Sequence, residues 1–463
     1  MKELTLTVHA FPTPDKNATL AVRYGGAVPR YTSYPTAPHF NGLVNGEVYA
    51  EWLATVGAGD KVSLYLHIPF CNELCWYCGC HTKIVRRYRP VAAYLETLLA
   101  EIDLVASKLG GRPEATCIHF GGGSPTILEP ADWRRVLDRL RERFDVAEDA
   151  EIAVEIDPRT MTPEYIAALA DAGVNRASIG VQEFDPDIQR RINRIQPFEV
   201  TAQVIAWLRD AGIDSINLDL MYGLPKQTLR HVEDMTARSL AFKASRIALF
   251  GYAHVPWMKT HQKLIRDEDL PGLDDRWRQA ERAAEILLDA GYVRVGFDHF
   301  ALPDDPIADI EPGSIGRNFQ GYTADTAETL IGFGASAISS LRQGYAQNAA
   351  SLPTYAEAVA EGHLPVRRGI ELSEDDKLRR HVIERVMCDL SIDVGRICAE
   401  HGMPVDYLDG AFDALQPLVR DGLVTISDRL IQVTEAGRPL VRNVAAVFDA
   451  YLENGQGRHS SAI

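Results

Sequence analysis

The sequence predicts an α/β protein centred on a partial (β/α)6 TIM-like barrel, with an N-terminal extension and a mainly helical, winged-helix-like C-terminal domain. Short β-rich runs alternate with helical patterns six times from about residue 63, and this alternation stops near residue 365. Repeated βα units require a parallel sheet with right-handed crossovers. We therefore expect the extension over 1–55, the barrel with its edge strands and loop over 56–362, and the C-terminal domain over 363–463.

Each expected unit pairs a short apolar run rich in β-branched residues with an amphipathic helical pattern. The strand-like runs are SLYLHI, ATCIHF, EIAVEI, RASIGV, SINLDL and RIALFGY. The helical patterns after them are VAAYLETLLAEIDLVASKL, WRRVLDRLRERF, PEYIAALADAG, IQRRIN with VIAWLRDAG, HVEDMTARSLAF and RWRQAERAAEILLDAG. A further run, YVRVGF, is expected to close or extend the sheet edge. Residues 303–316 are rich in Pro, Gly and Asp and predict a long loop, a candidate lid or substrate-facing insertion.

The last hundred residues follow a different pattern. Helical runs such as DDKLRRHVIERVMCDL and FDALQPLVRDG precede a predicted hairpin formed by LVTIS and LIQVT. Helices followed by a hairpin resemble a winged-helix module, which often binds DNA in other proteins. However, 64 acidic residues against 48 basic ones leave a net charge of −16, which repels phosphate backbones and anionic membrane surfaces. We expect a packing or substrate-covering domain, with no nucleic-acid partner and no membrane partner.

Composition indicates a soluble globular protein, with 46% hydrophobic and 24% charged residues. The first twenty residues lack a long apolar segment, and no stretch approaches the roughly 20 apolar residues of a membrane span. We therefore expect a cytoplasmic protein.

Cysteine spacing gives the sharpest chemical signal. Four of the seven cysteines crowd into one short segment: Cys71, Cys75, Cys78 and Cys80. The C-x3-C-x2-C pattern directly follows the first strand, and soft thiolates favour zinc or an iron–sulfur cluster. A structural zinc site usually pairs two distant C-x2-C knuckles, and no second knuckle is present. Three cysteines can instead hold three irons of a [4Fe–4S] cubane, which leaves one iron open. The other cysteines are expected to be small buried hydrophobes: Cys117, Cys388 and Cys398.

Further polar and glycine-rich segments fall where later strands end. FGGGSP follows the second strand, where it either forms a tight turn or lets backbone N–H groups approach a ligand. The strand-end polar residues are Glu155, Asp157, Gln182, Glu183 and Asp219. Singly, each suits a helix cap or an ion pair. In a barrel these ends share one mouth, which makes the group a candidate site.

The cysteine motif after the first strand of a βα array resembles the radical S-adenosylmethionine superfamily. Longer segments resemble a subgroup, the oxygen-independent coproporphyrinogen III dehydrogenases. These segments are PRYTSYPTAPHF, YLHIPFC, GGGSPT, EIDPR, GVQEF, NLDLMYGLPKQT, YAHVP and RNFQGY, spread over almost the whole chain. The resemblance implies that Cys71, Cys75 and Cys78 bind a [4Fe–4S] cluster whose open iron chelates S-adenosylmethionine.

The same resemblance implies two molecules of S-adenosylmethionine. The residues implied around the first are Tyr65, Gly122, Glu155 and Ile338. Those implied around the second are Tyr77, Gly123, Ser124, Gln182, Arg194, Asp219 and Ala253. Ser124 replaces the family's usual Thr, but it retains the hydroxyl group, so we expect binding to survive.

The implied reaction removes a hydrogen atom from the β-carbon of a propionate of coproporphyrinogen III, after which carbon dioxide and one electron leave. Two propionates become vinyl groups, which gives protoporphyrinogen IX. We expect a monomer that takes electrons from a flavodoxin or ferredoxin.

The candidate catalytic residues are Cys80, Tyr65 and His67. Cys80, which the cluster does not need, either transfers hydrogen or protects the site, or it is a buried loop cysteine. His67 either donates a proton or contacts ligand, or it is a structural imidazole. Arg30 and Arg317 either bind substrate carboxylates or form local ion pairs.

Two alternatives remain. A related haem chaperone keeps the cluster but usually carries an aromatic residue at position 80 and a His-Asn-x-x-Tyr-Trp motif where this chain has RNFQGY. That relative also tends to lack the PRYTSYPT segment. A DNA-associated regulator with the cluster as a redox sensor would leave the barrel motifs unexplained.

Overall fold

A twelve-stranded sheet forms the centre of the computed structural model, which describes residues 14–308, 311 and 313–452. Its middle six strands are parallel and lie side by side in chain order, as the sequence predicted. These strands are β1 (Lys61–Ile68), β4 (Glu114–Gly122), β5 (Asp145–Ile156), β6 (Arg176–Gln182), β7 (Ser215–Tyr222) and β8 (Arg246–Gly251). The predicted partial barrel is therefore confirmed.

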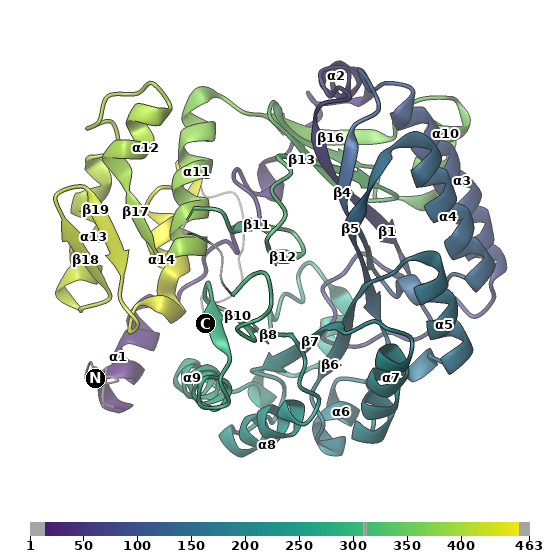
Figure 1. Ribbon diagram of the computed structural model, residues 1–463. Coiled ribbons are helices and arrows are strands. Elements are labelled where there is room, and N and C mark those ends of the chain that lie inside the picture. The colour runs from purple at the N-terminus through teal and green to yellow at the C-terminus, as the bar shows by residue number, and fades with distance from the viewer. Residues whose placement is uncertain (1–13, 309–310, 312, 453–463) are drawn as a thin grey trace, which may run out of the picture.

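Helices between the strands cover the outer face of the sheet (Figure 1). They are α3 (Arg89–Ala106), α4 (Pro130–Arg143), α5 (Pro163–Ala172), α6 (Pro186–Arg191), α7 (Phe198–Asp210), α8 (Leu229–Leu240) and α9 (Leu273–Asp289). In β1, Leu64, Leu66 and Ile68 are at most 1% exposed and belong to the core beneath these helices. Because side chains alternate across a strand, Tyr65 and His67 lie on the opposite, inner face.

Both edges of the sheet carry additional strands. Beyond β1 lie β13 (Thr329–Phe333), which is parallel to it, and then the antiparallel β14 (Ile338–Leu341), β15 (Gly344–Asn348) and β16 (Val366–Glu371). Beyond β8 lie the antiparallel β10 (His299–Ala301) and β9 (Val293–Val295). The run YVRVGF contains β9 and extends the edge. The boundaries at 55/56 and 362/363 stay predictions, although β16 follows the second and still pairs within this sheet.

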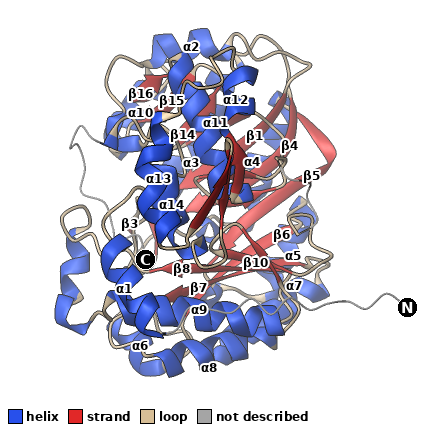
Figure 2. Cartoon of the chain, turned by 90° about the vertical axis from the view of Figure 1, so that its left-hand side faces the viewer, coloured by secondary structure: helices blue, strands red, loops and turns tan. Residues whose placement is uncertain are grey.

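The C-terminal part combines helices with a small three-stranded sheet. Its elements are α11 (Glu374–Asp389), β17 (Ser391–Asp393), α12 (Val394–Glu400), α13 (Gly410–Arg420), β18 (Val424–Ser427), β19 (Leu430–Val433) and α14 (Val441–Ala446). The antiparallel β18–β19 pair is the predicted hairpin. Figure 2 shows these elements in front of the open side of the large sheet, so this part covers the barrel.

The N-terminal segment packs against both parts of the molecule. It contains α1 (Pro14–Tyr24) and α2 (Gly46–Leu53). Tyr31 and Tyr34 are buried in one apolar cluster with Trp277 of α9 and Phe448 near the C-terminus. The extension therefore connects the barrel with the C-terminal part. Its residues 1–13 lie outside the described residues.

The remaining elements are short. They include α10 (Leu352–Ala360) and the hairpin of β11 (Gly316–Asn318) with β12 (Gly321–Thr323). Of the predicted loop 303–316, residues 309, 310 and 312 lie outside the described part of the chain. A bilayer-spanning helix, long and apolar enough to cross a membrane, is not found among the residues that the structure describes.

Candidate active site

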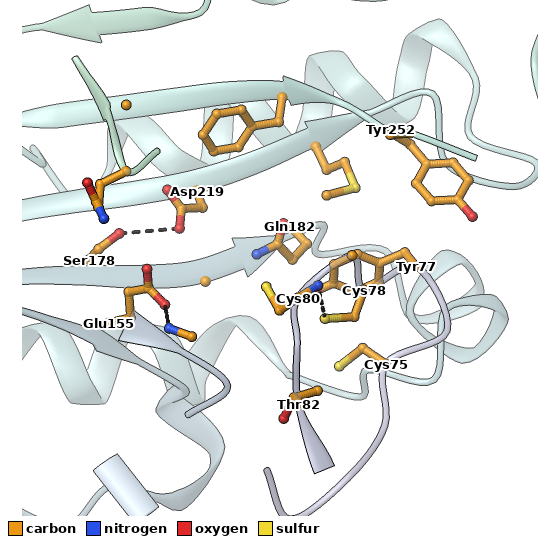
Figure 3. A pocket seen from close by; sticks show the side chains of 18 of the residues that line it. Cys75, Tyr77, Cys78, Cys80, Thr82, Glu155, Ser178, Gln182, Asp219 and Tyr252 are labelled. Carbon is orange, nitrogen blue, oxygen red and sulfur yellow. Dashed lines mark hydrogen bonds between the residues drawn. The ribbon is translucent and has the colours of Figure 1, made fainter. Parts of the chain in front are cut away.

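A cavity of about 470 Å³ opens at the carboxyl ends of the parallel strands (Figure 3). The cysteine segment forms one wall, and Glu155, Gln182 and Asp219 line the strand side. Because strand ends of a barrel meet at one mouth, residues far apart in the chain converge here. The predicted grouping of the cysteine motif with strand-end polar residues is therefore seen in the structure.

The cysteine loop is held at both ends and along its backbone. Two short parallel strands, β2 (Phe70–Cys71) and β3 (Lys83–Ile84), pair where the loop begins and ends. Three side chains after β8 then donate to its carbonyl oxygens: Lys259 Nζ to Cys80 at 3.0 Å, His261 Nε2 to Cys78 at 2.8 Å and Gln262 Nε2 to Tyr77 at 2.8 Å. The loop therefore depends on contacts made almost two hundred residues later.

Each sulfur of the three-cysteine motif has its own hydrogen-bond donor. Thr82 Oγ1 donates to Cys71 Sγ at 3.1 Å, and the amide of Cys80 donates to Cys78 Sγ at 3.4 Å. The guanidinium groups of Arg159 and Arg194 approach Cys75 Sγ. Such donors stabilise thiolates and tune iron–sulfur clusters.

The ionisation of these thiols depends on their surroundings. Burial raises the pKa of Cys71 to about 12, whereas the hydrogen bond from the side chain of Cys80 is the main cause that lowers the pKa of Cys78 to about 7. A soft metal centre deprotonates a thiol that it binds, which overcomes such an elevated pKa.

The donor set fits an iron–sulfur cluster. Three thiols open on one cavity, and cationic and hydroxyl donors surround them. Within the described ranges, no three His, Cys, Asp or Glu side chains converge as ligands of a single metal ion. A cubane suits this spread because each thiolate binds a different iron.

Two arginines form the charged side of the cysteine loop. Arg194 Nη1 donates to Cys75 Sγ at 3.6 Å, and Arg159 Nη2 lies 3.9 Å from the same sulfur. Both arginines also pair with Asp157. Burial raises the pKa of this carboxyl, but Arg194 and Arg159 outweigh burial and lower it to about 2. This cationic pair suits an anionic cluster.

The glycine run packs against the cysteine loop, and its amides are already in use. Gly122 N donates to Glu155 at 3.1 Å, Gly123 N to the Ile68 carbonyl at 2.9 Å, and Ser124 N to the Phe70 carbonyl at 2.7 Å. A Cβ at Gly123 would lie only 2.5 Å from the Phe70 carbonyl oxygen. Of the two alternatives that the sequence left open, the presentation of these N–H groups to a ligand is therefore not seen, and close packing explains Gly123.

His67 sits behind the cavity wall in a closed hydrogen-bond arrangement. Its Nε2 lies 2.9 Å from the carbonyl oxygen of His81, so this nitrogen donates, and its Nδ1 accepts from Tyr65 Oη at 3.0 Å. Burial lowers the pKa of His67, which keeps the ring neutral at pH 7. Both ring nitrogens of His67 therefore form hydrogen bonds, and neither His67 nor Tyr65 lines the cavity that holds the cysteine loop. The geometry therefore favours the structural reading of His67.

Asp219 is a half-buried carboxyl on β7. Asn217 Nδ2 donates to it at 2.8 Å, and Ser178 Oγ donates at 3.2 Å. Burial, followed by repulsion from Glu155, raises the pKa of Asp219 to about 6. This carboxyl and Glu155 face the same space, as Figure 3 shows, and together they can attract a cationic or hydroxyl-rich ligand.

Cys80 lies on the cavity wall, and its sulfur points away from Cys75 toward the side on which Glu155 lies (Figure 3). It is exposed, unlike the buried Cys388 and Cys398. The reading of Cys80 as a buried loop cysteine is therefore wrong.

The other predicted residues divide between the cavity and its surroundings. Of the residues expected around S-adenosylmethionine, those on the cavity wall are Tyr77, Gly122, Gly123, Ser124, Glu155, Gln182, Arg194, Asp219 and Ala253. Ile338 lies on β14 outside this lining and packs beside Phe40 and Tyr345. Glu183 also points elsewhere, since it accepts from Gln227 and from the amides of its two following residues. The contact of Ile338 stays a prediction.

Sequence reasoning missed several residues of the site. Arg159 belongs to the quoted EIDPR segment, where an arginine next to a strand-end Asp could have signalled it. Thr82 and the segment 259–262 had no local signal, because only the fold brings them to the cysteines.

Comparison with known proteins agrees with this geometry. Residues 65–238 match the model of the Radical SAM superfamily, and residues 372–440 match that of the HemN C-terminal domain. An oxygen-independent coproporphyrinogen III oxidase of Bradyrhizobium diazoefficiens is 50% identical over 448 residues, which are 96% of this chain and 100% of the relative. Its counterpart in Paracoccus denitrificans is 43% identical over 95% of this chain and 97% of its own length.

A solved structure agrees as well. The coproporphyrinogen III oxidase of Escherichia coli, described as a radical SAM enzyme, superposes with a TM-score of 0.86 and 38% identity, covering 91% of this chain and 97% of that one. Both of these relatives and this solved structure carry the name of the oxidase. The chain belongs to the oxygen-independent coproporphyrinogen III oxidases, a family of radical S-adenosylmethionine enzymes with a [4Fe–4S] cluster.

Proposed function

We propose that this chain converts two propionate side chains of coproporphyrinogen III to vinyl groups without oxygen, giving protoporphyrinogen IX for haem biosynthesis. The observation that carries the proposal is the shared cavity, which three thiols line on one side and the carboxyls Glu155 and Asp219 on the other. When bound, the reduced cluster supplies the electron that cleaves S-adenosylmethionine into the 5′-deoxyadenosyl radical that takes hydrogen from the substrate.

Cys71, Cys75 and Cys78 are the proposed cluster ligands. Their donors Thr82 and Arg194 support this assignment, because each stabilises thiolate charge. Cys80 lines the same cavity but is not a cluster ligand in this proposal. One iron then stays open for S-adenosylmethionine.

We propose that S-adenosylmethionine contacts the residues that the family resemblance implies. The amino group of the methionine moiety is a donor, so it needs acceptor oxygens. The amides of the glycine run are already bonded, so the run would contact this group through carbonyl oxygens. Glu155 and Asp219 offer further acceptors, and Asp219 supports the proposal of a second molecule because it lies apart from the glycine run on β7.

The localisation, oligomeric state and partners of the protein are also proposals. We propose a cytoplasmic monomer that receives electrons from a flavodoxin or ferredoxin and needs neither nucleic acid nor a membrane. We also propose that Tyr65 contacts the first S-adenosylmethionine, as the resemblance implies; its hydroxyl group donates to His67 behind the cavity wall.

An anaerobic assay tests the proposed function. The reconstituted protein receives reductant, S-adenosylmethionine, coproporphyrinogen III and an electron acceptor, and vinyl product is quantified after oxidation. Cys75→Ala should abolish product and cluster absorbance. Cys398→Ala makes the same change in a buried helix outside the cavity and should retain both. Cleavage of S-adenosylmethionine by the wild-type protein without vinyl product would reject the substrate, and haem binding would then be measured.

A further inference from the structure

The segment directly after the cysteine loop is strongly basic. It reads KIVRRYR over residues 83–89, and the chain has no acidic residue from 74 to 95. Its four cationic side chains are all exposed: Lys83, Arg86, Arg87 and Arg89. A chain with a net charge of −16 therefore carries a concentrated positive surface beside its proposed cluster ligands. We call residues 83–89 the basic segment.

Nearby carboxylates do not neutralise the basic segment. Among the residues that the structure describes, no ion pair joins any of its four cations to a carboxylate. Two acidic residues lie beside Tyr88 of the segment. Asp132 accepts hydrogen bonds from Tyr88 and from Arg135, and Glu129 donates its amide to the Tyr88 hydroxyl group at 3.0 Å. Even with both carboxylates counted against the four cations, the segment stays positively charged.

The basic segment is also hydrogen-bonded to one of the proposed cluster ligands. Its strand β3 pairs with β2, where Ile84 lies opposite Cys71. Val85 N donates to the Cys71 carbonyl at 3.0 Å. Thr82, which precedes the segment and lies next to the cysteines in Figure 3, donates Oγ1 to Cys71 Sγ at 3.1 Å. A single hydrogen bond therefore connects the exposed segment to a residue that holds the cluster.

The surface around this contact combines an apolar side chain with further positive charge. Ile84 is 41% exposed. Lys259, whose Nζ donates to the Cys80 carbonyl at 3.0 Å, lies close by. Burial lowers the pKa of His81, and the charges of Lys259 and Lys83 lower it further, so both cations lie near the same imidazole. An apolar contact with a charged rim is typical of a protein interface, and positive charge favours an acidic partner.

We propose that the basic segment, with Ile84 as its apolar contact, is the docking surface for a small acidic protein that carries single electrons on a flavin or an iron–sulfur centre. The inference rests on the proposed function and deepens it by naming where the electron donor binds. One electron leaves the reduced donor and reduces the cluster by one electron, and no bond forms or breaks. The hydrogen bond from Val85 to Cys71 provides a short path between the two centres.

The position of the charge distinguishes this partner from nucleic acid. A phosphate backbone would match four cations as well as an acidic protein does. However, only an electron donor gains from a place beside a cluster ligand, because electron transfer needs a short distance between the two centres. The net charge of −16 also repels a long polyanion over the rest of the surface. The observations therefore favour a compact acidic protein.

Binding of oxidised flavodoxin, an acidic flavin protein, to the reconstituted holoenzyme tests the docking surface by isothermal titration calorimetry. At low ionic strength, Arg86→Glu/Arg87→Glu should raise the dissociation constant at least about tenfold, the lower end of what electrostatic steering adds to an association rate. About 0.5 M salt should bring the wild type close to this variant, because the charges are exposed. Lys108→Glu/Arg420→Glu makes the same change in net charge at exposed cations beyond the other end of α3 and on α13, and should bind as the wild type does.

Two reductants then separate docking from chemistry. With reduced flavodoxin below saturation, Arg86→Glu/Arg87→Glu should cleave S-adenosylmethionine at least about tenfold more slowly than the wild type. Excess dithionite, a small chemical reductant, should drive both proteins at the same rate, which also shows that the variant folds and holds its cluster. An equal loss with both reductants would overturn the inference.

The remaining outcomes are equally decisive. Unchanged flavodoxin affinity in Arg86→Glu/Arg87→Glu would overturn the inference, and so would loss of binding to a DNA duplex without any loss for flavodoxin. Charge-dependent flavodoxin binding by a wild-type protein that cleaves S-adenosylmethionine but makes no vinyl product would reject the proposed substrate and retain the docking surface.

Discussion

The guanidinium of Arg194 lies against the sulfur of Cys75, with Nη1 3.6 Å from Sγ, while Nη2 donates to the Gly180 carbonyl at 2.6 Å. A residue in the loop after α6 therefore joins the cysteine loop to β6. Its charge is buried, with the side chain 8% exposed, so solvent screens the contact little. Arg194 is placed to influence the cluster electrostatically.

Arg194→Gln should make the reduction potential of the reconstituted cluster more negative by tens of millivolts. The removed positive charge favours the reduced state, which carries one more electron, and about 59 mV corresponds to tenfold in a one-electron equilibrium. A redox titration followed by electron paramagnetic resonance measures the shift. Arg190→Gln, at an exposed ion pair with Asp187, should leave the potential unchanged. A potential that stays constant or rises in Arg194→Gln would contradict this role.

Gly123→Ala should reduce the iron content of the reconstituted protein by more than half. The added Cβ would lie 2.5 Å from the Phe70 carbonyl and 2.7 Å from Thr82 Oγ1, and would displace the strands that hold both ends of the cysteine loop. Gly79→Ala is the matched control, because a Cβ there meets nothing within 4 Å. Iron and sulfide analysis compares the two variants. Similar iron content in both would show that the loop tolerates the displacement.

Glu101 should make the stability of the protein depend on pH. Tyr355 Oη and the Gly334 amide donate to one oxygen of this buried carboxyl, and Asn348 Nδ2 donates to the other. Burial outweighs these donors and raises the pKa of Glu101 from its ordinary value to about 7. Protonation therefore favours the folded state. This contribution is fully present below about pH 4.5 and is lost as the pH rises through 7, by about 3 kcal/mol at most.

Urea unfolding of the apoprotein between pH 5 and 8 checks this prediction. The wild-type free energy of unfolding should fall over the window, and Glu101→Gln should make the profile flatter whatever its stability at one pH. Glu96→Gln, on the same helix at an exposed ion pair with Arg135, should keep the wild-type slope. An unchanged slope in Glu101→Gln would assign the pH dependence to other groups, such as Glu183, whose pKa burial also raises to about 7.

Local patterns predicted the barrel because each βα unit carries its own periodicity and the cysteines carry their own spacing. The strand β13 was missed because TLIGF is short and pairs with β1, more than 260 residues earlier, so its place depends on a non-local contact. Arg276 on α9 and Arg442 on α14, which both line the cavity, were missed for the same reason. Their sequence surroundings show only helical patterns, and the tertiary packing that brings them to one cavity is not encoded locally. The amides of the glycine run show a further limit, since sequence could not tell a ligand contact from close packing.

Cys80→Ser and Cys78→Ser should separate a catalytic thiol from a cluster ligand within the same loop. Cys78→Ser should lower the iron content and abolish cleavage of S-adenosylmethionine, because a ligand is lost. Cys80→Ser should retain the iron and the substrate-independent cleavage, but reduce vinyl product at least about a hundredfold, the lower end of what one placed proton-transfer group contributes. The reason is that Cys80 points into the cavity and away from Cys75 (Figure 3). Loss of iron in Cys80→Ser would make it a ligand, and full product formation would leave it without a catalytic role.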